Sequence, residues 1–202
     1  MDAKPPNAEL LDAAAVGDAD RVKTALQNGA DIEARDDHER TALLLAATHD
    51  HIDVASVLIA HGADPNAIDD RHDTPWLVTG VTGSVAMLEV LLPANPDLTI
   101  RNRFGGVAVI PASHRGHVDY VRRVVQTAID INHVNDPGWT ALLETVILGD
   151  GSERWQQIVQ ILLDAGADST IADLDGVTPL EHVRAKGYEA IVRILTSANP
   201  SS

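Results

Sequence analysis

The chain has 202 residues, of which 45% are hydrophobic and 22% charged, a composition typical of one ordinary globular domain or at most two. Asp and Glu number 30 against 15 Lys and Arg, and the formal net charge of −15 argues against binding to nucleic acid or to an anionic membrane, because both need a basic protein face. The absence of cysteine excludes disulfides, a catalytic thiol and zinc sites built on thiolates.

The N-terminal residues carry no apolar segment of the kind found in a signal peptide, and no apolar run approaches the roughly 18 residues that a membrane span needs. We therefore expect a cytoplasmic protein whose residues 1–7 form a flexible segment before the folded domain. Aromatic residues make up only 3% of the chain, so Ala, Leu and other aliphatic residues must fill the core. Small residues let helices pack closely, which favours paired helices.

Short motifs recur along the chain with a period of 33 residues. Gly29-Ala30-Asp31 returns 33 residues later as Gly62-Ala63-Asp64, and Thr41 returns as Thr74. The same frame continues to the end of the chain, with five extra residues in the last interval. The expected repeat starts are Ala8, Thr41, Thr74, Val107, Thr140 and Thr178.

Each repeat predicts a pair of helices. A Thr at the start can accept a backbone N–H, and Pro or Ala suits the first helical position. A Gly nine residues later predicts a left-handed residue that ends the first helix, with Asp50 in this place in the second repeat. Aliphatic residues at helical spacing, as in residues 54–59, predict the second helix. The glycines in question are Gly17, Gly83, Gly116, Gly149 and Gly187.

With all these markers in one frame, the chain resembles the ankyrin-repeat family over about residues 8–198. The family pattern combines a hairpin turn with Thr-Pro-Leu-His-x-Ala-Ala, Gly-His, Val, Leu-Leu and Gly-Ala-Asp. The resemblance implies an all-α fold, an α-solenoid of six ankyrin repeats in which helix-turn-helix units are joined by β-hairpin-like loops. It implies a single domain over residues 8–198, followed by a short tail at 199–202.

The chain also departs from the family pattern. Glu39 and His72 stand where the hairpin usually has Gly, which predicts strained turn residues, and Ala128 stands where a left-handed Gly is usual. Residues 93–130 combine several prolines with Val107, which has no oxygen to cap a helix. This stretch fits either tolerated drift or a hinge. The family histidine is absent, and apolar packing is expected in its slot, which holds Leu11, Leu44, Leu77, Ile110, Leu143 and Glu181.

Nine histidines raise the question of a metal site. His51 and His117 fall directly after the helix-ending slot, where the family often carries His, so a structural loop role is the preferred interpretation. Their neighbours His49 and His114 are marked by no converging set of three or four ligands. No nucleophile elbow or phosphate-binding glycine loop is present. Acidic residues that recur once per repeat are predicted to be turn residues: Asp31, Asp64, Asp97, Asp130 and Asp168.

The resemblance implies a binding surface made of hairpin tips and first-helix ends, which in the family line a concave groove. Its N-terminal half is polar here, and its C-terminal half collects aromatic and aliphatic residues. Interface hot spots are enriched in Trp, Tyr and Arg, so Trp139 is predicted to be the anchor; alternatively, it and Phe104 pack onto adjacent hairpins. The predicted protein-binding residues are Arg40, His49, Asp73, Arg103, Phe104, His114, Arg115, Trp139, Ile147 and Leu148.

Two further tryptophans are expected elsewhere. Trp76 replaces a family Leu and is predicted to lie in the core. The five extra residues, 150–154, predict an exposed flexible loop between the two helices of the fifth repeat. Trp155 follows this loop and is either a hydrophobic lid on the helix pair or a second contact point.

These patterns predict a monomeric, non-catalytic scaffold that binds another protein with a basic surface, without a cofactor or a metal. An inhibitor or immunity-like regulator of another enzyme or toxin is the alternative within binding. An enzyme with a histidine-based metal site is the remote alternative.

Overall fold

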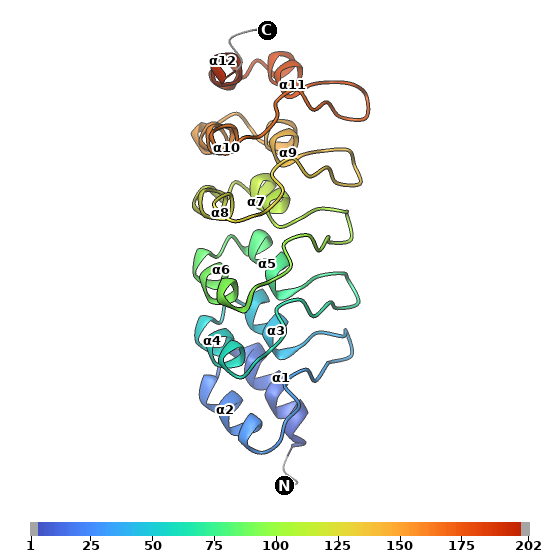
Figure 1. Ribbon diagram of the computed structural model, residues 1–202, viewed down its shortest axis with the longest axis vertical. Coiled ribbons are helices and arrows are strands. Elements are labelled where there is room, and N and C mark those ends of the chain that lie inside the picture. The colour runs from blue at the N-terminus through green and yellow to red at the C-terminus, as the bar shows by residue number, and fades with distance from the viewer. Residues whose placement is uncertain (1–3, 199–202) are drawn as a thin grey trace. The chain divides into compact units, whose positions relative to one another are not determined.

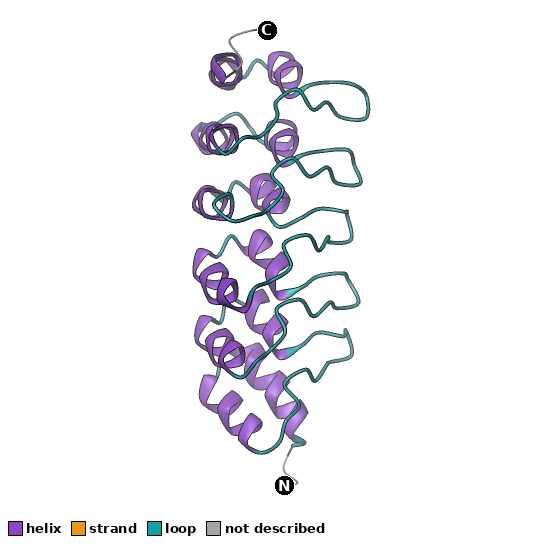
Figure 2. Ribbon diagram, viewed as in Figure 1, coloured by secondary structure: helices purple, strands orange, loops and turns teal. Residues whose placement is uncertain are grey.

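The computed structural model describes residues 4–198, and the predicted ends at 1–3 and 199–202 lie outside the described residues. The described residues form twelve α-helices and one 3-10 helix (Figures 1 and 2). They contain no strand beyond an isolated bridge between Arg35 and Thr41, so the all-α prediction is confirmed. The chain divides into two compact units, residues 1–103 and 104–202, and the single domain over 8–198 stays a prediction.

Unit 1 contains three helix pairs whose first helices pack against one another in one layer and whose second helices pack in another. The loops between pairs lie beside the first layer (Figure 1). The pairs are α1 (Pro6–Val16) with α2 (Ala19–Gln27), α3 (Ala42–Thr48) with α4 (Ile52–Ala60), and α5 (Pro75–Thr82) with α6 (Val85–Leu91), which continues into η1 (Leu92–Ala94).

Unit 2 repeats this arrangement, with the first helices in one layer and the second helices in another. Its pairs are α7 (Val109–Arg115) with α8 (Val118–Val124), α9 (Ala141–Leu148) with α10 (Glu153–Asp164), and α11 (Pro179–Lys186) with α12 (Glu189–Ala198). The six predicted helix pairs are therefore present, and the first helix starts at Pro6, two residues before the predicted Ala8.

Threonine hydroxyls start four of the first helices. Thr41, Thr74, Thr140 and Thr178 each accept a hydrogen bond from the backbone N–H three residues later, at 3.1–3.4 Å. Such a cap is worth about 1 kcal/mol. Val107 cannot make this bond, and α7 begins only at Val109 with no side-chain cap.

Left-handed residues end the first helices, with one exception. Asp50 has φ 58°, and four of the predicted glycines have φ between 70° and 79°. Gly149 was expected to do the same, but its φ is −71°, so that prediction is wrong. The longer loop of the fifth repeat gives the left-handed turn to Gly151, at φ 77°, instead.

The Trp155 ring explains why residue 149 is glycine. A Cβ built on Gly149 would lie 1.8 Å from Cδ1 of Trp155, and one built on Gly116 would lie 1.6 Å from Cζ3 of the same ring. Trp155 therefore packs on the ends of both α7 and α9, which favours the lid interpretation. The predicted loop at 150–154 is shorter than expected, because Glu153 already belongs to α10.

The expectations for left-handed turn residues hold at two hairpin positions and fail at one position after a second helix. Glu39 and His72 have φ of 60° and 61°, as predicted for residues that replace a turn glycine. Ala128 is not left-handed. After α8 the chain turns instead through Thr127, whose N–H and hydroxyl both donate to the Val124 carbonyl and whose hydroxyl accepts from the Ile129 N–H.

The core consists of aliphatic residues and Trp76, which is fully buried as predicted. In four of the six slots that the family gives to histidine, the side chain is 3% exposed or less. These are Leu44, Leu77, Ile110 and Leu143. At these positions a buried aliphatic side chain therefore occupies the slot in which the family pattern has a histidine.

Residues 93–130 should show the weakest amide protection in the described chain. They contain the uncapped start of α7 and the left-handed Asn95, at φ 54°, and the boundary between the two units falls within them. Repeat proteins open locally where neighbouring repeats hold each other least. Native-state hydrogen exchange is the measurement, and protection in this segment equal to that of residues 41–59 would contradict the prediction.

Gly116→Ala should destabilise the protein more than Gly187→Ala. Both glycines have similar φ, 73° and 70°, so both variants incur the same backbone strain, about 1 kcal/mol. Only the Cβ at residue 116 would collide with Trp155, since nothing lies within 4 Å of the one at 187. Overpacking of this kind costs about 1–3 kcal/mol, and urea unfolding of the two variants measures the difference.

Candidate functional site

A recurring polar residue shapes four of the hairpins. Asp36 accepts the N–H of Arg40 at 3.0 Å through its side chain and donates its own N–H to the Arg40 carbonyl at 3.1 Å. The same pair of bonds recurs, at 2.8–3.0 Å, with Asp69, Asn135 and Asp173. These residues stand five positions before the repeat's Thr, a recurrence that the sequence shows but that the prediction did not use.

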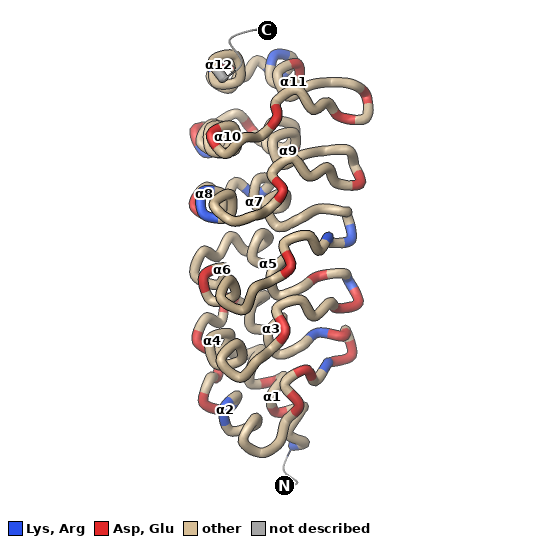
Figure 3. The backbone as a smooth tube through the Cα atoms, in the orientation of Figure 1, with Lys and Arg blue, Asp and Glu red and all other residues tan. Residues whose placement is uncertain are grey.

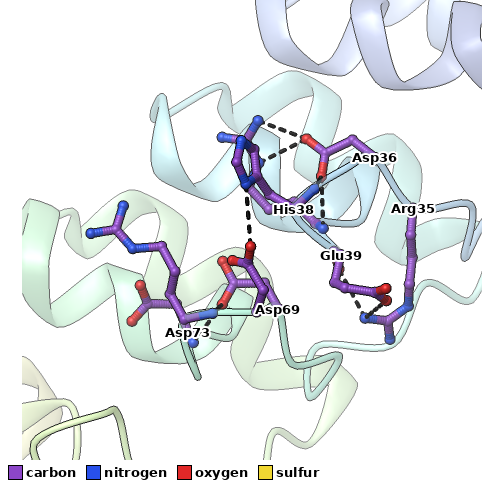
Figure 4. Close-up of polar contacts among 9 residues, drawn as sticks. Arg35, Asp36, His38, Glu39, Asp69 and Asp73 are labelled. Atoms are coloured by element: carbon purple, nitrogen blue, oxygen red, sulfur yellow. Dashed lines mark hydrogen bonds and ion pairs between the residues drawn. The ribbon is translucent and has the colours of Figure 1, made fainter.

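Neighbouring hairpins of unit 1 are joined by polar contacts (Figure 4). Arg35 donates to the carbonyls of Glu39 and Ile68 at 2.8 and 2.6 Å. His38 Nδ1 lies 3.2 Å from Oδ2 of Asp70. The tips therefore form a connected polar surface within this unit.

Neighbouring hairpins of unit 2 are joined by closer packing. Asp136 donates its N–H to the Phe104 carbonyl at 3.0 Å, and its side chain covers Gly105. Leu174 covers Gly138 in the same way: a Cβ built on that glycine would lie 2.4 Å from Leu174 Cγ. A side chain on either glycine would separate the tips.

The once-per-repeat acidic residues are turn residues, as predicted. Each accepts the N–H of the residue two positions on, at 2.8–3.0 Å. In Asp97 and Asp168, hydrogen bonds from the hydroxyl and N–H of the following threonine hold the pKa below the ordinary value. Asp and Glu recur along the loops of both units (Figure 3).

The predicted residues of unit 1 are engaged with neighbouring side chains. Arg40 donates to Asp36 at 2.8 Å, and Asp73 lies 3.9 Å from Arg103. Burial, reinforced by the charge of Asp69, raises the pKa of Asp73, and Arg103 opposes this only in part. His49 is exposed at the end of α3, with its ring centroid 5.8 Å from that of His51.

The predicted residues of unit 2 present a more apolar surface. Phe104 is 54% exposed and Leu148 is 43% exposed, while Trp139 and Ile147 are half-buried. Leu174, on the next hairpin tip, is 80% exposed. The predicted residues that are exposed are His49, Arg103, Phe104, His114, Arg115 and Leu148.

Glu144, which the sequence did not single out, is buried next to Asn135 and His114. It belongs to α9 and is only 7% exposed. Asn135 Nδ2 donates to its Oε1 at 2.9 Å, and His114 Nδ1 lies 3.2 Å from its Oε2. Burial raises the pKa of Glu144, and His114 and Asn135 offset this only in part.

Histidine and acidic side chains do not converge on a metal-binding arrangement in residues 4–198: no group of three or more could hold an ion. His51 Nε2 lies 3.1 Å from the Ala15 carbonyl, and the residue packs on Gly17. His182 Nε2 lies 2.7 Å from Oδ2 of Asp173. These histidines connect neighbouring parts of the repeats.

Comparison with known proteins gives the same family as the repeat pattern. A family model of three ankyrin repeats matches residues 10–102. A protein of Escherichia coli (strain K12) named as an ankyrin repeat protein, YahD, is 40% identical over 192 residues, which are 95% of this chain and 96% of that protein. The chain belongs to the ankyrin-repeat family.

Solved structures agree with this assignment. An ankyrin repeat domain from Acinetobacter baumannii AYE has a TM-score of 0.90 and 46% identity, covering 94% of this chain and 96% of that one. The ankyrin repeat protein EF0377 has a TM-score of 0.92 and 37% identity, covering 96% and 98%. An L-asparaginase from Dirofilaria immitis is 29% identical over 183 residues, which are 91% of this chain but only 30% of that protein.

Ankyrin repeat domains generally mediate protein–protein interactions. No helix in the described part of the chain is both long and apolar enough to cross a membrane.

Replacing Glu144 should change how stability depends on pH. Because its pKa in the folded state is raised above the ordinary 4.5, the wild-type protein loses stability as pH rises from about 4.5 to the folded-state pKa. Glu144→Gln lacks this titration, so its free energy of unfolding should rise relative to wild type over that window. Urea unfolding at a series of pH values measures the difference.

Glu181→Gln is the matched control, because the pKa of Glu181 is lowered and its effect on the pH dependence of stability is opposite to that of Glu144. Hydrogen bonds from the N–H and the hydroxyl of Thr178 lower the pKa of Glu181, so this carboxylate stabilises the protein above its unfolded pKa. The control variant should lose stability relative to wild type as pH rises. A difference between Glu144→Gln and wild type that does not vary with pH would contradict the effect of burial.

Proposed function

We propose that this protein is a non-catalytic interaction module that binds a partner protein through its hairpin tips and first-helix ends, with the main anchor in unit 2. In the ankyrin family these elements line a concave groove. The observation that carries the proposal is the exposure of large apolar side chains at hairpin tips, where Phe104 is 54% and Leu174 is 80% exposed. The core does not need these side chains.

The rigidity of the hairpins supports this proposal. Trp139 is fixed through its backbone, since its N–H donates to Asn135 Oδ1 at 2.8 Å and its carbonyl accepts from the Asn135 N–H at 3.0 Å. A surface held in this way needs little ordering when a partner binds, which favours affinity. Ile147 and Leu148, at the end of α9, would supply further apolar contacts.

The net charge of −15 supports a partner with a basic surface. An inhibitor or immunity-like regulator of another enzyme or toxin remains the alternative within binding. The monomeric state and cytoplasmic location stay predictions, and so do the absence of catalysis and of any cofactor. Affinity purification from native cells with mass spectrometry tests the proposal by identifying the partner.

Trp139→Ala should weaken binding of that partner about thirty-fold or more, because truncating an interface anchor costs about 2 kcal/mol or more. The fold should persist, since Trp139 is only half-buried. Titration calorimetry on both proteins measures the loss. Gln157→Ala, which truncates an exposed side chain on the second helix α10, away from the hairpin tips and first-helix ends, is the control and should bind normally. Equal affinity of Trp139→Ala and wild type would contradict the anchor.

Binding should also weaken as salt concentration rises. Exposed charges act over about 8–10 Å at physiological salt, and added salt shortens this range. The fall in affinity with rising salt should come mainly from a slower association rate, because complementary charges steer the encounter. Surface plasmon resonance at increasing salt gives both rates, and an affinity independent of salt would argue against a basic partner.

A further inference from the structure

Glu144 is the one buried acid in a slot that the other repeats fill differently. The residue four positions after the repeat start is the buried Leu45 in the second repeat and the buried Val78 in the third. The other repeats place Asp12, Pro111 and His182 there, none of them buried. A carboxylate in this position must be desolvated, which is costly unless its oxygens are fully bonded.

The two carboxylate oxygens of Glu144 are treated differently. Oε1 accepts the hydrogen bond from Asn135 Nδ2 at 2.9 Å. Oε2 is buried and has no donor in hydrogen-bonding geometry, although His114 Nδ1 lies 3.2 Å away. No Lys or Arg forms an ion pair with Glu144 in the described part of the chain. One buried carboxylate oxygen therefore lacks a hydrogen-bond donor.

This oxygen lies close to the proposed binding surface. Asn135 joins Glu144 to the Trp139 backbone, because its amide oxygen accepts the Trp139 N–H while its amide nitrogen donates to the carboxylate. The side chain of His114 is 52% exposed on the last turn of α7. To reach Oε2, a partner side chain would have to displace this exposed imidazole.

We propose that Glu144 is a specificity site that receives an arginine side chain from the bound partner in place of the His114 imidazole. This inference rests on the proposed binding function and names one chemical requirement of the partner. A guanidinium keeps its charge when desolvated, donates to carboxylates in a planar geometry and stacks on aromatic rings. The net charge of −15 favours the approach of a cation.

Peptide display gives a direct test with a defined probe. A random peptide library is selected on wild type, on Glu144→Gln and on Glu153→Gln, the last being a control for an exposed acid of the second helix α10. Wild type and Glu153→Gln should enrich arginine at one fixed position, and Glu144→Gln should not. Thermal unfolding verifies that each variant is folded.

Synthetic peptides then quantify the contact. Replacing the enriched arginine by citrulline, its neutral isostere, should weaken binding to wild type about ten-fold or more and leave binding to Glu144→Gln nearly unchanged. Selection of peptides without arginine, or the same arginine dependence in Glu144→Gln, overturns the site.

Failure of the proposed function gives a different result. If Trp139→Ala abolishes binding and Glu144→Gln leaves the arginine dependence intact, only the arginine site is wrong. If neither variant changes binding of the selected peptides, or if wild type selects none, the binding surface itself is wrong and the site is overturned with it.

Discussion

Within each unit, the helix pairs bury their apolar faces against neighbouring pairs, and the rest of the structure depends on this stacking. Close approach is possible because small residues occupy the contacts: Ala46 and Ala47 of α3 are fully buried. Glycines serve the same purpose where a neighbour covers them, as Trp155 covers Gly116 and Gly149. A repeat with a poorer cap or turn therefore weakens its neighbours as well as itself.

Stacking fixes the spacing of the hairpins, and the polar residue at the base of each hairpin fixes its conformation. Asp36, Asp69, Asn135 and Asp173 all bond the backbone N–H four residues on. Tip residues also contact neighbouring hairpins, as Asp136 covers Gly105 and Leu174 covers Gly138. Tip residues held on fixed supports suit recognition of a partner, and in this chain they are polar in unit 1 and more apolar in unit 2.

Glu144 stands out because it is the one buried acid at the position four residues after a repeat start. A buried acid in an apolar slot lowers stability at neutral pH, and residues that violate a local folding rule are concentrated at functional sites. Its contacts come from α7, α9 and the hairpin before α9, all within unit 2. The proposed role in binding would account for both the cost in stability and the link through Asn135 to the Trp139 backbone.

The sequence by itself determined the family, the six helix pairs, the threonine caps and the turn residues, because each depends on contacts within one repeat that recur every 33 residues. Only the tertiary structure decided what lies between repeats. Gly149 is glycine because Trp155 packs on it, Ala128 needs no left-handed turn because Thr127 closes the chain differently, and Glu144 meets His114 from the preceding repeat. Such contacts join residues about 30 positions or more apart or follow from altered loop lengths, and a single repeat frame carries no information about either.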